Sequence, residues 1–220
     1  MAKRGMIIGS YYTNVRWTLA PGWALSDPEQ VTDMVDVPGR RKGPLDLSTA
    51  LTDGDPVYGS RTLEATFECS EGTRMEREGW ISQMVNALDG YTHHIVLPDD
   101  PLHYLVGRVN VKRLYNDLAH ASVQVVAVCE PWRYSSAETI ITLTATAETQ
   151  TATLPNNGRL AVVPLLTVTG GTVNLVSGTY SWALGVGSYM LPDLLMLYGG
   201  KVITYSGSGV LTATYREAVL

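Results

Sequence analysis

The 220-residue sequence has only two cysteines and one phenylalanine, and it has no long hydrophobic run. Cys69 and Cys129 lie in apolar, alternating segments rather than in a C-x-x-C pair. We therefore expect two reduced core residues, with a single disulfide between them as the alternative. No segment approaches the roughly 18 to 20 apolar residues of a membrane-spanning helix, and the apolar run near the N-terminus is too short for a secretion signal. These absences predict a protein made in the cytoplasm, without membrane insertion.

The sequence also lacks a basic excess, because 21 acidic residues outnumber 16 Lys and Arg and give a net charge of -5. A protein that binds free nucleic acid needs a concentrated basic face, which this balance argues against. Charge is distributed unevenly as well: residues 1–136 hold 30 of the 37 charged side chains, and residues 137–220 hold seven and contain no His or Cys. This shift predicts two modules, 1–136 and 137–220, joined at Pro131 to Ser136.

Alternating apolar residues in the first module predict strands with one buried face. Tyr12–Leu19 and Leu63–Cys69 show this pattern, and the segment between them is rich in turn residues. Leu102–Leu114 and Ala119–Glu130 predict two long antiparallel strands, joined near residues 115–117. The inward face of this hairpin is expected to carry Leu105, Gly107, Val109 and Val111 on one strand and Ala121, Val123, Val125, Ala127 and Cys129 on the other.

One amphipathic helix is predicted after these first strands. Thr73 and Glu76 have the spacing of a capping box, and Gly90 marks the end of the helix. The apolar stripe that should pack on the sheet consists of Ile81, Met84, Val85 and Leu88.

The second module contains many short β-segments separated by glycine turns, a pattern typical of a β-sandwich or a barrel. The segments are Ile141–Ala147, Leu160–Val163, Leu165–Val168, Val173–Val176, Tyr180–Leu184, Leu194–Tyr198, Lys201–Tyr205 and Val210–Tyr215. Gly185–Ser188 and Gly207–Gly209 are reminiscent of phosphate-binding loops but lack the full spacing. We interpret both as hairpin turns.

A cluster of His and Asp residues near the middle of the chain is the best candidate for a metal site. It consists of His93, His94, Asp99, Asp100 and His103. Adjacent residues of a strand point to opposite faces, so the first two imidazoles cannot bind one ion, and Asp99–Pro101 is typical of a turn. We therefore predict no metal and no catalytic residue. A metal-dependent hydrolase that uses His93, Asp99 or His103 is the alternative.

Two further groups are candidates for contacts with other molecules. Arg40, Arg41 and Lys42 form a short basic run, too few charges for general nucleic-acid affinity, which we interpret as a solvated loop tip or a contact with a neighbouring subunit. The aromatic residues that could stack on a glycan are Trp182, Tyr189 and Tyr198. Each lies in or beside an apolar strand, so packing in the core or between the modules is the favoured interpretation.

Several short motifs occur in a recognisable order along the chain. In the first module they are Val37–Arg40, Leu45–Ser48, Tyr58–Thr62, the amphipathic helix, Asp99–Pro101, Tyr104, Gly107–Val109 and the block Pro131, Trp132, Arg133, Tyr134 and Ser135. In the second they are Asn157–Arg159, Pro164, Gly199–Gly200 and Tyr215–Glu217. The series resembles the distal tail proteins of long-tailed, siphovirus-type bacteriophages, whose first module ends at a Pro-aromatic-basic-Tyr-Ser block.

The resemblance implies a mainly β fold, with a split-barrel or sandwich belt domain that carries one helix and a galectin-like C-terminal β-sandwich. It implies a hexameric ring below the tail tube, with first modules around a DNA channel and second modules projecting outward. The partners would be the tail tube, tape-measure and tail-tip or receptor-binding proteins, in the virion and without any cofactor. Arg41 and Lys42 depart from the simpler turn expected there. A carbohydrate-binding module for host attachment is the alternative function.

Overall fold

The computed structural model describes residues 3–36, 38, 43–50, 52 and 55–220, so the basic run Arg40, Arg41 and Lys42 lies outside the described residues. The chain forms two compact units, Met1–Pro131 and Trp132–Leu220. Strands predominate, and the described residues contain one α-helix. The expected fold class, mainly β with one helix and a sandwich, is confirmed.

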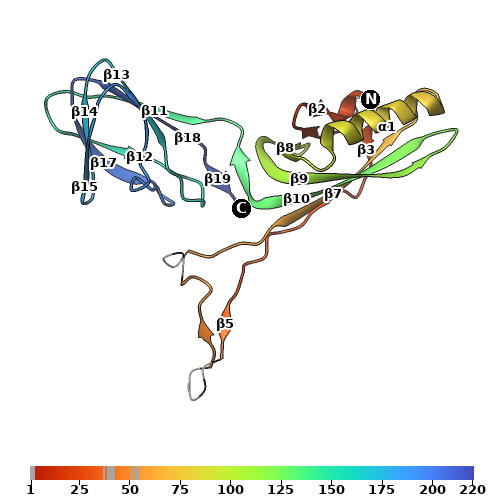
Figure 1. The fold of residues 1–220 in the computed structure, drawn as a ribbon, viewed down its shortest axis with the longest axis horizontal. Helices are drawn as coiled ribbons and strands as arrows, with labels where there is room; N and C mark the ends of the chain where they lie inside the picture. Colours follow the sequence, from red (N-terminus) through yellow and green to blue (C-terminus); the bar gives the residue numbers. More distant parts are fainter. Residues whose placement is uncertain (1–2, 37, 39–42, 51, 53–54) are drawn as a thin grey trace. The chain divides into compact units, whose positions relative to one another are not determined.

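A curled antiparallel sheet forms the framework of the first unit (Figure 1). Its strand order is β2-β1-β8-β9-β10-β7-β3, and β4 also pairs with β7. The strands are β1 (Ile7–Ile8), β2 (Tyr11–Tyr12), β3 (Thr18–Leu19), β4 (Ala24–Leu25), β7 (Arg61–Cys69), β8 (Thr92–Leu97), β9 (Asp100–Asn116) and β10 (Ala121–Ser135). The long hairpin is present as predicted, as β9 and β10.

The prediction of one strand over Tyr12–Leu19 was wrong, because a 3-10 helix, η1 (Thr13–Val15), separates β2 from β3. The buried hydroxyl of Thr13 accepts from the Met6 amide at 2.8 Å and donates to the Met6 carbonyl at 2.9 Å. These bonds turn the chain back on the N-terminal segment, where alternation alone predicted an extended strand.

The inward faces of the long strands carry the residues that alternation predicted. Every residue of the two predicted rows on β9 and β10 is buried, and β7 buries every second residue from Arg61 to Cys69. Gly107 allows close packing of β9 on β10, since a Cβ there would lie 2.4 Å from Sγ of Cys129. A side chain at position 107 would therefore force β9 and β10 apart.

The helix α1 (Arg74–Leu88) covers the inward face of this sheet. Its capping box is formed, with the Thr73 amide donating to Oε2 of Glu76 at 2.7 Å and the Glu76 amide donating to Oγ1 of Thr73 at 3.3 Å. Ile81, Met84 and Leu88 are buried in the core. The predicted cap is confirmed, and so is the predicted stripe, whose fourth member, Val85, is half-buried and packs against the same core.

Arg77 ties the start of α1 to the turn of the β9–β10 hairpin, although its exposed fraction is only 1%. Its guanidinium donates to the carbonyl oxygens of Gly72 at 2.7 Å and Asp117 at 2.8 Å. Longer bonds, at 3.4 Å, reach the Glu71 carbonyl and Oδ1 of Asn116. A buried cation is stable here because backbone carbonyls replace the water it loses.

Residues 26–60 leave the sheet between β4 and β7 and form a segment that we call the arm (Figure 1). Its described part contains β5 (Met34–Val35) paired with β6 (Leu45–Asp46). An isolated bridge joins Gln30 to Tyr58, and the Val31 amide donates to the Val57 carbonyl at 2.8 Å. No described residue of the arm is buried. The described part of the arm therefore takes no part in the core of its own unit.

The second unit is a β-sandwich of two four-stranded sheets, β11-β18-β13-β16 and β12-β17-β14-β15. The strands are β11 (Thr139–Thr144), β12 (Gln150–Leu154), β13 (Leu165–Thr169), β14 (Val173–Ser177), β15 (Tyr180–Leu184), β16 (Gly187–Met190), β17 (Lys201–Gly207) and β18 (Val210–Tyr215). One core takes side chains from both sheets, among them Leu166, Leu175, Ile203 and Leu211. The predicted segments Leu160–Val163 and Leu194–Tyr198 are not strands, and only the bridge Val162–Met196 joins them.

The two glycine segments that we interpreted as hairpin turns instead carry the chain from one sheet to the other. β15 and β16 belong to different sheets, and so do β17 and β18. Gly207 has a φ of 142°, and a Cβ at this position would lie 2.1 Å from the Thr172 carbonyl oxygen. Glycine is thus required by a close backbone approach at the crossing between sheets.

Replacing Arg77 tests its role in the first unit. We expect Arg77→Met to lower the free energy of unfolding by about 2–4 kcal/mol, because buried carbonyl oxygens lose charged donors. Urea unfolding followed by circular dichroism measures this. Arg74→Met, an exposed position three residues earlier, should change stability by less than about 0.5 kcal/mol. Equal stability of the two variants would contradict the assignment.

Candidate functional site

The structure separates the two adjacent histidines of the candidate metal cluster. His93 lies on the inward face of β8, opposite Gly107 on β9, and its Nε2 is buried. His94 is exposed on the other face, where its ring stacks on Tyr104 with the centroids 4.4 Å apart. The two side chains thus point to opposite faces of β8, as predicted.

The remaining members of the cluster have other partners. Nδ1 of His103 lies 2.8 Å from Oδ1 of Asp100, and Asp99 forms an ion pair with Arg4. The turn between β8 and β9 consists of Pro98 and Asp99 only, since β9 already begins at Asp100. In the described ranges, no three His, Cys, Asp or Glu side chains form a group that could hold a metal ion.

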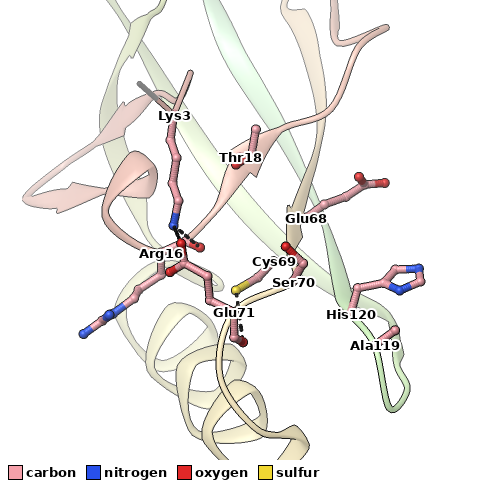
Figure 2. A pocket seen from close by; sticks show the side chains of 9 residues that line it. All are labelled: Lys3, Arg16, Thr18, Glu68, Cys69, Ser70, Glu71, Ala119 and His120. Atoms are coloured by element: carbon pink, nitrogen blue, oxygen red, sulfur yellow. Dashed lines mark hydrogen bonds and ion pairs between the residues drawn. The ribbon is translucent and has the colours of Figure 1, made fainter. Parts of the chain in front are cut away.

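A pocket of about 320 Å³ lies beside the ends of β3 and β7 in the first unit (Figure 2). Lys3 crosses it, with its Nζ 2.8 Å from Oε1 of Glu71 and donating to the Arg16 carbonyl at 3.3 Å. The hydrogen bond and the charge of Lys3 lower the pKa of Glu71. Figure 2 shows the Cys69 sulfur turned toward Glu71 and the His120 ring pointing away from it. Cys69 and His120 thus both line the pocket, but they are not paired as a nucleophile and its general base.

Both cysteines are free and buried, in line with the expectation of reduced core residues. Burial raises the pKa of Cys129 to about 11. A buried thiol of this kind stays protonated and behaves as a small apolar side chain.

The three aromatic residues proposed for glycan stacking come from three different segments. Trp182 on β15 packs against the sandwich core and stacks on Tyr180, with the ring centroids 5.8 Å apart and an interplanar angle of 11°. Tyr189 on β16 also packs against the core, and its hydroxyl donates to the Gly185 carbonyl at 3.2 Å. Tyr198 is exposed in the segment before β17. Tyr180, which covers one face of the indole, was missed by sequence reasoning because nothing in its own segment marks it.

The block Trp132–Ser135 and the end of the chain come together within the second unit. β19 (Ala218–Val219) pairs with β10 at Arg133 and Tyr134. Arg216 donates to the carbonyls of Ser135 at 3.0 Å and Ser136 at 2.7 Å. The Ser135 amide in turn donates to the Glu217 carbonyl at 2.9 Å. We call Trp132–Ser136, Arg216–Val219 and the Asn156–Gly158 loop that packs on them the closing cluster.

The Asn156–Gly158 loop completes the closing cluster. Nδ2 of Asn157 donates to Oε1 of Glu217 at 3.2 Å, and a Cβ at Gly158 would lie 2.5 Å from the Ala218 carbonyl oxygen. Asn156 is fully buried and donates to the carbonyls of Leu160 at 2.9 Å and Met196 at 3.0 Å. Three motifs that are far apart in sequence are therefore neighbours in space.

Comparisons with known proteins agree with this fold. No protein-family model matches the chain, and no curated protein sequence does. Among solved structures, the chain is similar to the Dit protein of phage SPP1, described as a paradigm of the hub adsorption apparatus in phages that infect Gram-positive bacteria. The TM-score is 0.64 at 12% sequence identity, over 96% of this chain and 98% of that chain. The likeness covers both units and shows a shared fold.

Gly158→Ala tests the packing of the closing cluster. We expect a loss of about 1–3 kcal/mol in the stability of the second unit, because the new methyl group must displace the backbone of β19. Gly185→Ala is the matched control, since the nearest atom to its Cβ would be the Tyr189 hydroxyl at 3.8 Å. Thermal unfolding of both variants compares them, and an unaffected Gly158→Ala protein would refute the contact.

The raised pKa of Cys129 predicts a pH dependence of stability. An unfolded thiol ionises near its ordinary value of 9.0, whereas the folded thiol ionises near 11. The stabilisation is therefore fully present well below pH 9 and is lost as the pH rises from 9 toward 11, at about 1 kcal/mol per pH unit. Urea unfolding between pH 9 and 10 should show this slope. Cys129→Ala should reduce the slope, while an undiminished slope in that variant would assign it to other groups.

Proposed function

We propose that this chain is a structural hub protein of a phage tail tip, which assembles as a hexameric ring and joins the tail tube to tip, fibre or receptor-binding proteins. In this assembly the first unit forms the belt around a channel that DNA crosses, and the second unit faces outward. The ring is made in the host cytoplasm and becomes part of the virion tail. Its work is assembly rather than catalysis.

One observation carries this proposal: the fold likeness to the SPP1 hub protein extends over both units, with 96% of this chain and 98% of that one aligned. A single β-sandwich is shared by many unrelated proteins and would carry little weight. The combination of a curled sheet with one helix, an arm and a C-terminal sandwich is far more specific. The order of the short motifs supports the same family independently of the fold.

Physical features of the first unit suit a closed ring. β2 is the last strand on one side of the sheet, and Tyr12 in it is exposed. An open sheet edge favours pairing with another chain, and head-to-tail contacts between identical subunits close into rings when the rotation permits. A net charge of -5 per chain suits a channel that DNA passes through without adhering.

The closing cluster lies at the end of β10, in the part of this strand that belongs to the second unit. Backbone pairing to β19, the Arg216 bonds and the Gly158 contact all fix this short stretch of β10 within the second unit. Pro131, Trp132, Arg133, Tyr134 and Ser135 thereby keep their proposed role as the inter-domain joint.

The oligomeric state tests the proposal. Light scattering of the purified protein should give six times the chain mass of 23.9 kDa, and negative-stain images should show rings with a central hole. The same rings should be present at the tip of tails assembled in infected cells. A strictly monomeric protein at high concentration, with no ring in virions, would contradict the proposal.

A further inference from the structure

Asn157 and Gly158 form the one Asn-Gly pair in the sequence. This dipeptide is chemically labile, because glycine has no side chain to keep its backbone nitrogen away from the preceding side-chain amide. Once that nitrogen has lost its proton to solvent base, it can attack Cγ of Asn157 within the same chain. The new nitrogen–carbon bond forms, the Cγ–Nδ2 bond breaks, and the amide group takes up a proton and leaves as ammonia. Water then opens the succinimide ring to aspartate or isoaspartate, so that one amide has been hydrolysed to one carboxylate.

The closing cluster holds the reacting nitrogen in place. The Gly158 amide donates to Oδ1 of Asn156 at 3.0 Å. Asn156 is itself fully buried, and its Nδ2 is anchored on the carbonyls of Leu160 and Met196. Gly158 is buried as well, against the backbone of Ala218. Ring closure requires that the Gly158 N–H is released and that the loop rotates, so it has to await an opening of the cluster.

The carboxylate that deamidation creates would face another carboxylate. Nδ2 of Asn157 donates to Oε1 of Glu217 at 3.2 Å and lies 3.5 Å from Oε2. In the product a negatively charged oxygen replaces this donor, so a hydrogen bond becomes a contact between like charges. Glu217 directly precedes β19, and its carbonyl accepts from the Ser135 amide at 2.9 Å. The repulsion therefore acts at the residue that joins β19 to the end of β10.

The isoaspartate product disturbs the same contacts in a second way. It lengthens the backbone by one methylene group directly before Gly158. A Cβ at Gly158 would already lie 2.5 Å from the Ala218 carbonyl oxygen, so the loop has no room for additional atoms here. Both products thus oppose the contacts that close the cluster.

We propose that Asn157 is a site of spontaneous deamidation that the closing cluster controls. While the cluster is closed, the Gly158 amide stays on Asn156 and the Asn157 amide persists. A transient opening admits the reaction, and the carboxylate formed then weakens the bonds that closed the cluster. Modified chains accumulate with time, because release of ammonia into water is not reversed. The reaction needs water alone, and it is independent of the proposed assembly into a ring.

Peptide mass spectrometry of the full-length protein tests the protection. The protein is kept at mildly alkaline pH, either folded or in urea, and is digested at mildly acidic pH. We expect Asn157 to deamidate at least about tenfold faster in urea, because the folded protein reacts only from its open state. Asn174 is the internal control, since the bulky Leu175 follows it and hinders ring closure. Equal rates in the two conditions would overturn the protection, and an unmodified Asn157 in urea would overturn the site.

A variant of Arg216 tests whether the closing cluster, rather than the fold in general, sets the rate. Arg216→Gln removes the bonds to the end of β10 and leaves the Asn-Gly pair unchanged. We expect the folded variant to deamidate about threefold faster or more. Arg113→Gln is the matched control, because it breaks an exposed ion pair in the first unit and should not change the rate. Circular dichroism checks that both variants are folded. A folded Arg216→Gln protein with the wild-type rate would count against control by the cluster.

Asn157→Asp reproduces one product and tests its consequence. Hydrogen exchange of the backbone amides in residues 132–136 and 216–219 should become about threefold faster or more, because the cluster opens more often. Asn174→Asp adds the same charge at an exposed position of β14, where its paired neighbours are Ser206 and Ala183, and should leave this exchange unchanged. Adding Glu217→Gln to Asn157→Asp places an amide donor opposite the new carboxylate and should return the exchange to within about twofold of wild type.

The exchange measurements separate the possible results. Faster exchange in Asn157→Asp with recovery in the double variant supports a direct contact with Glu217. Unchanged exchange in Asn157→Asp overturns the effect on the cluster. Faster exchange that Glu217→Gln does not reverse contradicts the pairing of these two side chains. Each result stands apart from the oligomeric state, which tests the proposed function.

Discussion

One-sided burial of a curled sheet is the constraint on which the first unit depends. β7 buries every second side chain, and β9 and β10 do so over Leu105–Val111 and Ala121–Cys129, so a shift of one residue in any of them would turn the buried row to solvent. The contact of Gly107 with Cys129 leaves no room between β9 and β10 for another side chain at position 107. Arg77 then fixes α1 at one end by bonding to the hairpin turn. Alternation, one close contact and one buried cation together determine how helix and sheet fit.

The parts of this fold that the sequence could predict are those with local signals. The capping box at Thr73 and Glu76, the stripe of α1 and the alternation of β9 and β10 each depend on residues close in the chain. The crossings between sheets at Gly185–Ser188 and Gly207–Gly209 could not be predicted in this way. A glycine turn has the same local sequence whether the second strand pairs with the first strand or joins the opposite sheet. Only tertiary packing, such as that near Thr172, determines which of the two forms.

The candidate site was predictable only through motif order, for a similar reason. Asn157, Gly158 and Arg216 are ordinary turn or surface residues when read locally, yet Asn157 bonds to Glu217, Gly158 packs on β19 and Arg216 bonds to the end of β10. Arg77 carried no signal either, because an arginine in an amphipathic helix is normally solvated and its carbonyl partners come from two distant loops. Residues whose role is a long-range backbone contact are invisible to periodicity and composition.

The uneven charge distribution now has a physical interpretation. The outer face of the β11-β18-β13-β16 sheet carries a row of hydroxyls, Thr142, Thr212, Thr167 and Ser188, on directly paired positions of its four strands. Such a face interacts with water and carries no formal charge at these four positions. The first unit, by contrast, holds most of the charged side chains of the chain. If charge complementarity selects the ring contact of the proposed hub, an uncharged sandwich face keeps the second units from competing for it, because a charged face would attract other copies as well.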